Sequence, residues 1–151
     1  MNVDGSYNSE GGIGAGDLIQ DKKGNWHIGF ASNDGQGDLL FAELFVVYHG
    51  ITLLLQDGYS REIIESDSLE ALQSLSRRNK LEFHVYNSLL LRIASSIDYA
   101  LNLVLYHVFQ EVNYSVFWLA KYGNPSAVGV TTWFSSTFSL LDQLCRDALC
   151  T

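Results

Sequence analysis

Alternating apolar residues near the start of the chain predict three β-strands. Two short runs, Ile13–Ile19 and Trp26–Ala31, flank a loop rich in Asp, Lys, Gly and Asn, which is typical of an antiparallel hairpin. A third strand around Val3 precedes the Gly11-Gly12 turn and would adjoin the first of these runs. This part of the chain therefore predicts an antiparallel three-stranded segment.

Further along, the apolar residues recur at steps of three and four from Leu40 to Leu54, which predicts an amphipathic helix that ends at Asp57-Gly58. The remaining pattern predicts a strand over 61–66, helices over 68–75 and 89–100, a strand over 103–109 and a helix over 113–122. Strands and helices in this order predict an α/β protein with a mixed sheet.

Length and composition restrict the class of protein. A chain of 151 residues is the size of one domain with a sizeable core. Its hydrophobic fraction of 47% and charged fraction of 17% predict a folded protein and exclude a disordered one. The formal net charge of −8 argues against a broad basic face, so a phosphate-bearing ligand would need metal ions or a small local basic patch.

Targeting signals are not apparent in the sequence. The start of the chain lacks a basic segment followed by an apolar one, which favours an intracellular protein, although the compartment stays open. The two cysteines, Cys145 and Cys150, have neither the number nor the spacing of a disulfide framework or a zinc site. Ionisable residues interrupt both long apolar stretches, 39–55 and 101–109, so we expect no membrane span.

The glycine-rich stretch Gly11–Gly16 is similar to part of a dinucleotide-binding loop. It lacks the final glycine of that motif, and a strand rather than a helix follows it. We therefore interpret this stretch as hairpin backbone and expect no nucleotide cofactor.

Three carboxylates occupy positions that could converge. Asp4 lies inside the first predicted strand, Glu43 lies on the first predicted helix, and Asp67 lies at the carboxyl end of the fourth strand. If the fourth strand pairs in parallel with the first, the right-handed crossover carries Glu43 over the sheet end where Asp4 and Asp67 project. Three acids at the edge of an apolar core repel one another unless cations hold them, and Mg²⁺ or Mn²⁺ suits such an oxygen-only cluster.

Several sequence blocks, in this order and spacing, resemble the ribonuclease H fold, specifically the plant ribonuclease H-like (reverse-transcriptase-like) domains found in retroelement-derived proteins. The matching blocks are Asn2-Val3-Asp4-Gly5-Ser6, Gly14-Ala15-Gly16 through Ile19-Gln20-Asp21, Gly24-Asn25-Trp26, Ala42-Glu43-Leu44, Glu65-Ser66-Asp67-Ser68, His107 through Asn113, and Trp118-Leu119-Ala120-Lys121.

The resemblance implies a three-layer α/β fold, with a five-stranded mixed sheet flanked by helices. It implies that Asp4, Glu43 and Asp67 bind Mg²⁺ or Mn²⁺, and that His107 is the histidine of a flexible active-site loop. The activity that it implies is hydrolysis of the RNA strand of RNA–DNA hybrids by two metal ions.

The same resemblance implies how nucleic acid is recognised. Backbone groups near Gly5 and Ser6, together with Glu43, would contact 2′-hydroxyls across the minor groove, and Asn113 would also contact nucleic acid. Cleavage is then expected to depend little on sequence.

The chain departs from the family pattern at the fourth metal-binding acid. That acid is expected ten residues after His107, where this sequence has Phe117, and an aromatic ring cannot ligate Mg²⁺. The first prediction is therefore a metal-dependent nuclease of reduced efficiency. The alternative is a catalytically inactive nucleic-acid-binding or interaction module derived from a retroelement, and a third is a truncated copy of low stability.

The resemblance divides the chain into a ribonuclease H-like domain over 1–123 and a C-terminal tail over 124–151. The tail has apolar residues at near-helical spacing, which fits packing either on the domain or on a neighbouring chain. The natural substrate and the oligomeric state stay open.

Overall fold

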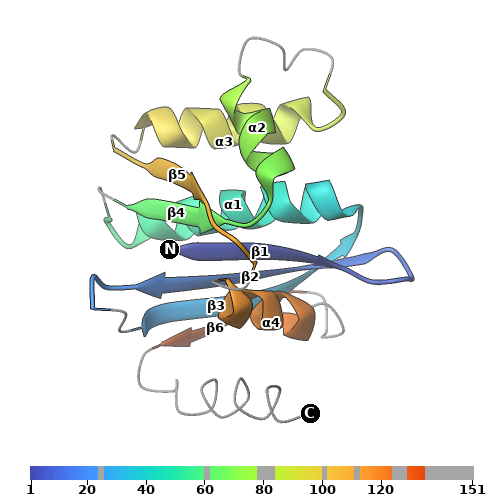
Figure 1. Ribbon diagram of the computed structural model, residues 1–151, viewed down its shortest axis with the longest axis horizontal. Coiled ribbons are helices and arrows are strands. Elements are labelled where there is room, and N and C mark those ends of the chain that lie inside the picture. Colours follow the sequence, from blue (N-terminus) through green and yellow to red (C-terminus); the bar gives the residue numbers. More distant parts are fainter. Residues whose placement is uncertain are drawn as a thin grey trace.

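A computed structural model of the chain describes residues 1–23, 26–59, 62–77, 84–99, 102–110, 113–123 and 129–134 (Figure 1). One mixed sheet has the strand order β5-β4-β1-β2-β3-β6. The strands are β1 (Asn2–Tyr7), β2 (Gly12–Gln20), β3 (Trp26–Gln36), β4 (Ile63–Ser66), β5 (Val104–His107) and β6 (Gly129–Phe134). The helices are α1 (Leu39–Gln56), α2 (Leu69–Ser76), α3 (Asn87–Tyr99) and α4 (Tyr114–Gly123).

The predicted order of elements is confirmed, and with it the α/β fold with five strands in a mixed sheet. A sixth strand, β6, lies beyond the predicted domain boundary at residue 123 and pairs antiparallel with β3 from Gly129 to Phe134. The described part of the predicted tail therefore belongs to the sheet. The rest of the tail, 135–151, lies outside the described residues, as do 124–128.

The pairing of β1 with its two neighbours fixes the end of the sheet that carries the acids. β1 pairs antiparallel with β2 and parallel with β4, in a register that sets Val3 beside Ser66. The crossover from the hairpin to β4 is α1, which Asp38 caps by accepting a hydrogen bond from the Phe41 N–H at 2.8 Å. The parallel pairing needed for convergence of the acids is thus present.

Two glycines allow helices to pack directly on the strands, one on each face of the sheet. A Cβ atom at Gly5 would lie 2.6 Å from the backbone nitrogen of Glu43 in α1. A Cβ atom at Gly16 would lie 2.4 Å from the backbone nitrogen of Ala120 in α4. Since real Cβ contacts are never this short, any larger residue would force the helices away from β1 and β2. Figure 1 shows α1 behind the sheet and α4 in front of it.

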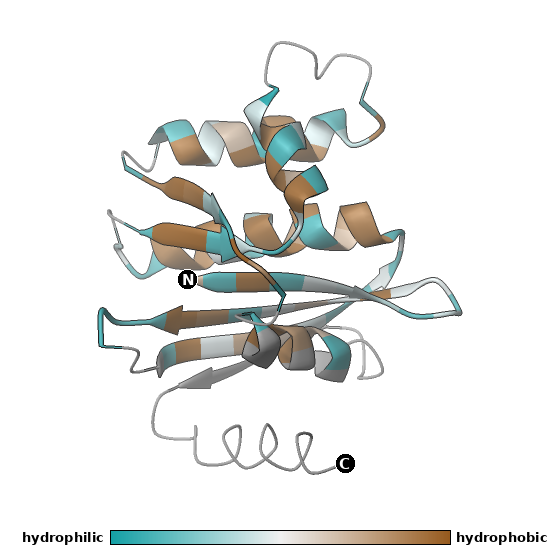
Figure 2. Cartoon of the chain, in the orientation of Figure 1, coloured by the Kyte–Doolittle hydropathy of each residue, from teal (hydrophilic) through white to brown (hydrophobic). Residues whose placement is uncertain are grey.

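The main core lies between the sheet and α1, with α3 packed on the far side of α1. Hydrophobic residues concentrate on these strands and helices (Figure 2). The largest side chains that are fully buried are aliphatic, and they include Ile13, Ile19, Leu44, Ile51, Leu54, Ile64, Leu90, Ile93 and Leu119. Burying each of them contributes about 1.5–3 kcal/mol relative to leaving it exposed.

Helix α1 is unusually apolar, and Glu43, which we expected to interrupt this stretch, lies within the helix. By length and composition, α1 is the one helix in the described part of the chain that could span a membrane. Core helices of folded domains meet the same test, and α1 packs against β1, β2 and α3.

Candidate metal centre

Asp4 and Asp67 occupy equivalent places on adjacent parallel strands. Asp4 follows Val3 on β1, Asp67 follows Ser66 on β4, and Val3 and Ser66 are register partners. The turn after β4 is held by the Ser66 hydroxyl, which accepts a hydrogen bond from the Ser68 N–H at 3.1 Å. Both carboxylates therefore reach the same end of the sheet, as the sequence predicted.

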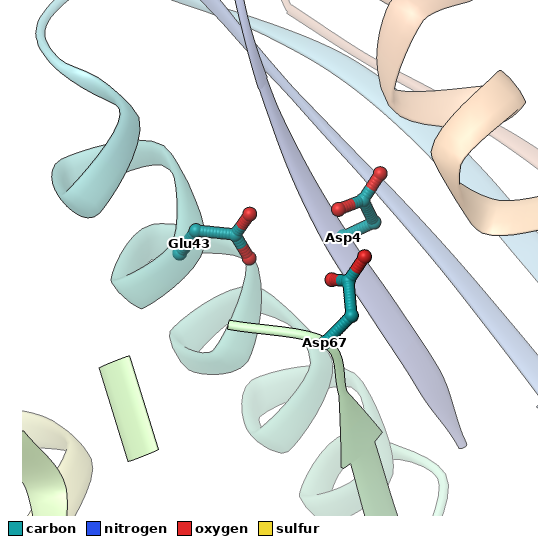
Figure 3. A group of neighbouring side chains, drawn as sticks. All are labelled: Asp4, Glu43 and Asp67. Atoms are coloured by element: carbon teal, nitrogen blue, oxygen red, sulfur yellow. The ribbon is translucent and has the colours of Figure 1, made fainter. Parts of the chain in front are cut away.

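Glu43 reaches this end of the sheet from α1. It lies in the second turn of the helix, where α1 passes directly over Gly5 on β1. Each of the three residues has a carboxylate oxygen within 4.8 Å of the others, and the three side chains point toward one another (Figure 3). The structure thus brings together Asp4, Glu43 and Asp67.

Asp4 and Glu43 are shielded from solvent, Asp67 is partly buried, and one oxygen of each carboxylate lacks a donor in the described part of the chain. Asp4 is 3% exposed and Glu43 is 5% exposed. One buried oxygen of each carboxylate, Asp4 Oδ2, Glu43 Oε2 and Asp67 Oδ1, has no hydrogen-bond partner among the described residues. Buried polar atoms normally have partners, so these three oxygens have room for a ligand.

Burial and mutual repulsion disfavour ionisation of the carboxylates of Asp4 and Glu43. Burial, followed by the negative charges of Glu43 and Asp67, raises the pKa of Asp4 to about 10. Burial and the charge of Asp67 raise the pKa of Glu43 to about 8, while a hydrogen bond from the Gly5 N–H lowers it. A cation held between the carboxylates would remove this repulsion, and oxygen ligands alone favour a hard divalent ion.

His107 lies at the carboxyl end of β5, beside the cluster. Its register partner on β4 is Ser66, the residue before Asp67. The imidazole is exposed, and it contacts the ring of Phe109 edge-on with a centroid distance of 5.9 Å. His107 therefore lies at the rim of the site, outside the group of three carboxylates.

The other residues expected to contact nucleic acid, Gly5, Ser6 and Asn113, are buried. The Ser6 hydroxyl donates to the Ala120 carbonyl at 2.7 Å, and the Asn113 amide donates to the Val3 carbonyl at 2.8 Å. These bonds hold α4 and the segment before it against the strand that carries Asp4. Contact of the three residues with nucleic acid stays a prediction.

Sequence reasoning missed a polar network next to the cluster. The Asn2 amide donates to Glu65 Oε2 at 2.8 Å and to Asn113 Oδ1 at 3.2 Å. Together with the bond from Asn113 to Val3, this network connects β4, β1 and the segment before α4. The available signal was the position of Asn2 and Glu65, two residues before Asp4 and Asp67 and therefore on the same face of the sheet.

The sequence profile of the family described as reverse transcriptase-like matches residues 2–123, most of the chain. The chain belongs to the reverse transcriptase-like family. A search among curated proteins found no match.

Solved structures confirm that this family member has the ribonuclease H fold. RNase H1 from Halobacterium salinarum is 14% identical, with a TM-score of 0.72 over 81% of this chain and 93% of that chain. LC11-RNase H1, solved in complex with an RNA/DNA hybrid, is 20% identical, with a TM-score of 0.73 over 82% of this chain and 94% of that chain.

The prototype foamy virus protease–reverse transcriptase is 16% identical, with a TM-score of 0.68. The alignment covers 83% of this chain but only 20% of that much longer protein. At these identities, the similarity of all three structures to this chain concerns the fold.

In this member of the reverse transcriptase-like family, Phe117 lies in the first turn of α4, and its N–H donates to the Asn113 carbonyl at 3.1 Å. Phe117 lies one helical turn after Asn113, which bonds to the residue before Asp4, so the two side chains share a helix face. The Phe117 ring is half-buried, and the Lys121 ammonium lies 4.3 Å from its centroid. Where the resemblance predicts a fourth acid, α4 thus presents an aromatic ring covered by a cation.

Proposed function

We propose that this protein hydrolyses the RNA strand of RNA–DNA hybrids with divalent metal ions, at a rate reduced by the absence of a fourth acid. The observation that carries the proposal is the buried cluster of Asp4, Glu43 and Asp67, in which three carboxylate oxygens lack hydrogen-bond partners among the described residues. The family and the fold support the same reaction class. A retroelement origin fits the likeness to the foamy virus protein, and the intracellular location expected from the sequence is part of the proposal.

The residues of the cluster fit Mg²⁺ or Mn²⁺ because all three donors are carboxylates, and a cation would relieve the repulsion that helps to raise the pKa values of Asp4 and Glu43. The bound ions would supply an activated water and stabilisation of the leaving 3′ oxygen. Asp4 inside β1, Asp67 just after β4 and Glu43 on α1 would each supply an oxygen to the ions. His107, exposed at the rim, would move protons between the site and solvent.

Selectivity for RNA would come from groups near β1. Glu43 has one oxygen directed into the cluster, and its position over Gly5 brings it to the margin where a 2′-hydroxyl would bind. Gly5 and Ser6 would take part through their backbone groups, and Asn113 would act mainly by holding Val3, the residue before Asp4.

Cleavage of an end-labelled RNA–DNA hybrid tests the proposal. We expect cleavage of the RNA strand with Mg²⁺, none with EDTA, and none by Asp67→Asn, which keeps the shape of the side chain but removes its charge. Asp57→Asn, at the exposed C-cap of α1, is the matched control and should cleave like wild type. Cleavage by Asp67→Asn at the wild-type rate would contradict the proposal.

Metal binding should also be visible without any substrate. If the cluster binds Mg²⁺ with a Kd of about 1 mM, then 10 mM Mg²⁺ stabilises the fold by about 1.4 kcal/mol, which raises the Tm by about 4 °C. Thermal unfolding followed by circular dichroism measures this shift. We expect Asp67→Asn to lose it, and an equal shift in both proteins would show that Mg²⁺ binds elsewhere.

A catalytically inactive nucleic-acid-binding module is the second candidate function. The observation that favours it is Phe117, with Lys121 over its ring, where a fourth acid is expected. Binding of the hybrid in the presence of Mg²⁺ without any cleavage would support this candidate over the first.

A further inference from the structure

The segment that follows β5 crosses the end of the sheet where the acids lie. At its start, the Val108 N–H donates to the Ser66 carbonyl at 3.0 Å, beside Asp67. At its end, the Asn113 side chain bonds to the Val3 carbonyl, beside Asp4. Figure 1 shows the first residues of this segment, 108–110, passing in front of β4 and β1. The described ends of the segment therefore lie beside Asp67 and beside Asp4.

Phe109 is the most exposed apolar side chain on this segment. It is 74% exposed, and its ring lies edge-on to His107, which is itself at the rim of the site. The structure thus presents an aromatic ring to solvent beside His107, whereas burial of this ring in the core would have stabilised the fold.

A separate apolar row lies on one face of the neighbouring strands β4 and β5. Ile63, Val104 and Tyr106 are each about half exposed and lie on the same face of β4 and β5. Tyr106 is the register partner of Glu65, which bonds to Asn2, so this is the face on which α4 packs. Helix α4 packs on β1, β2 and β3 and leaves this part of the face exposed.

The charge of the protein favours stacking as the way in which it holds nucleic acid. With a net charge of −8 and an acidic cluster, the protein gains little from neutralising phosphates. Stacking of a base on an aromatic ring depends little on charge and on sequence. Inside a continuous duplex, however, both faces of each base are covered, so an exposed ring can stack only on a terminal or unpaired base.

We infer that Phe109 is a substrate-binding residue that stacks on an unpaired nucleotide next to the hybrid, so that the protein prefers hybrids with a single-stranded extension. This inference rests on the proposed function, and it adds the class of substrate that the site selects.

Fluorescence anisotropy with labelled hybrids in Mg²⁺ tests the inference. The Asp67→Asn protein is used throughout so that no cleavage occurs. Two hybrids each carry a four-nucleotide single-stranded extension, one at each end of the duplex. We expect one of these two hybrids to bind about tenfold more tightly than a blunt hybrid. Adding Phe109→Ala should abolish this difference and leave the affinity for the blunt hybrid within about twofold.

Two further variants separate stacking from apolar contact and from unfolding. Phe109→Trp keeps an aromatic face and should keep the preference, whereas Phe109→Leu keeps apolar bulk and should lose it. Tyr99→Ala removes an exposed ring at the end of α3, before β5 begins, and should bind both hybrids like the parent protein.

Each contrary outcome has a definite meaning. Binding of hybrids with no preference for an extension, or a preference that survives Phe109→Ala, would overturn this inference and leave the proposed function intact. Failure of both the wild-type protein and Asp67→Asn to bind any hybrid would overturn the proposed function and this inference together. Unchanged hybrid binding by Phe109→Ala with a change of oligomeric state in gel filtration would assign Phe109 to a protein interface and overturn the inference.

Discussion

Replacing Phe117 by Asp is expected to raise the rate of Mg²⁺-dependent hybrid cleavage about hundredfold, the order of effect of one well-placed charged group in an active site. Asn113 fixes α4 to β1 beside Asp4, and Phe117 lies one turn further on the same face. A carboxylate there would add a fourth oxygen ligand to the site, which the phenyl ring cannot supply. Single-turnover cleavage of the labelled hybrid measures the gain.

Lys121 needs a matching change in this experiment. Its ammonium lies over the Phe117 ring, so it would pair with a new carboxylate and hold it away from the metal. We therefore expect a larger gain from Phe117→Asp combined with Lys121→Gln than from Phe117→Asp alone. Phe117→Asn, of the same shape but uncharged, is the control and should stay at the wild-type rate. No gain from either Asp variant would mean that the loss of activity has another cause.

Replacing Asp17 by Val is expected to stabilise the protein by about 3 kcal/mol at pH 7, because it removes a buried carboxylate without partners. Asp17 is fully buried between β2 and α1, and neither of its oxygens has a hydrogen-bond partner among the described residues. Its Oδ2 lies 2.6 Å from where a Cβ atom of Gly50 would be, so α1 covers it closely. Valine is a good strand former and fits the site without a polar atom. Urea unfolding measures the difference.

The effect of Asp17 should depend on pH with a defined sign. Burial raises its pKa to about 8, although the positive charge of the N-terminus opposes this. Since the folded state keeps the proton that the unfolded state loses above its ordinary pKa near 4, stability falls as the pH rises from about 4 to 8. The advantage of Asp17→Val over wild type should therefore grow over this range and level off above pH 8.

Asp17→Asn is the control for this prediction. The amide has the shape of the carboxyl group and no charge. The difference in stability between Asp17→Asn and wild type should therefore depend on pH in the same way as it does for Asp17→Val. The gain at pH 7 should be smaller than for valine, because the amide is also buried without partners. An advantage of Asp17→Val that is the same at pH 5 and pH 8 would contradict the assignment of the effect to ionisation.

The sequence predicted the convergence of the three acids because their geometry follows from strand pairing. Once the fourth strand is parallel to the first, Asp4 and Asp67 must reach the same end of the sheet, and the crossover brings in Glu43. The same logic predicted the order of the elements. The role of His107 in an active-site loop stays a prediction; the structure places it at the end of β5, with Ser66 of β4 as its register partner.

Features that depend on side-chain contacts could not be predicted from the sequence. The hydrogen bonds of the Ser6 and Asn113 side chains to the Ala120 and Val3 carbonyls depend on how α4 packs on the sheet, which the sequence does not show. Strand β6 was missed because the prediction from the sequence ended the sheet at β3, whereas β3 lies between β2 and β6. The isolation of Asp17 depends on α1 and Gly50 lying over it, which no local pattern indicates.

The packing of α1 on Gly5 and of α4 on Gly16 has a consequence for how this site can vary in evolution. At both points, backbone atoms of the helix contact the backbone of the strand. The distance between helix and strand around Asp4 is therefore set by main-chain atoms, which are the same in every residue type. Substitutions elsewhere can then accumulate without displacing the acids. A scaffold of this kind tolerates wide divergence, as the retained fold at 14% and 20% identity to the two RNase H1 structures illustrates.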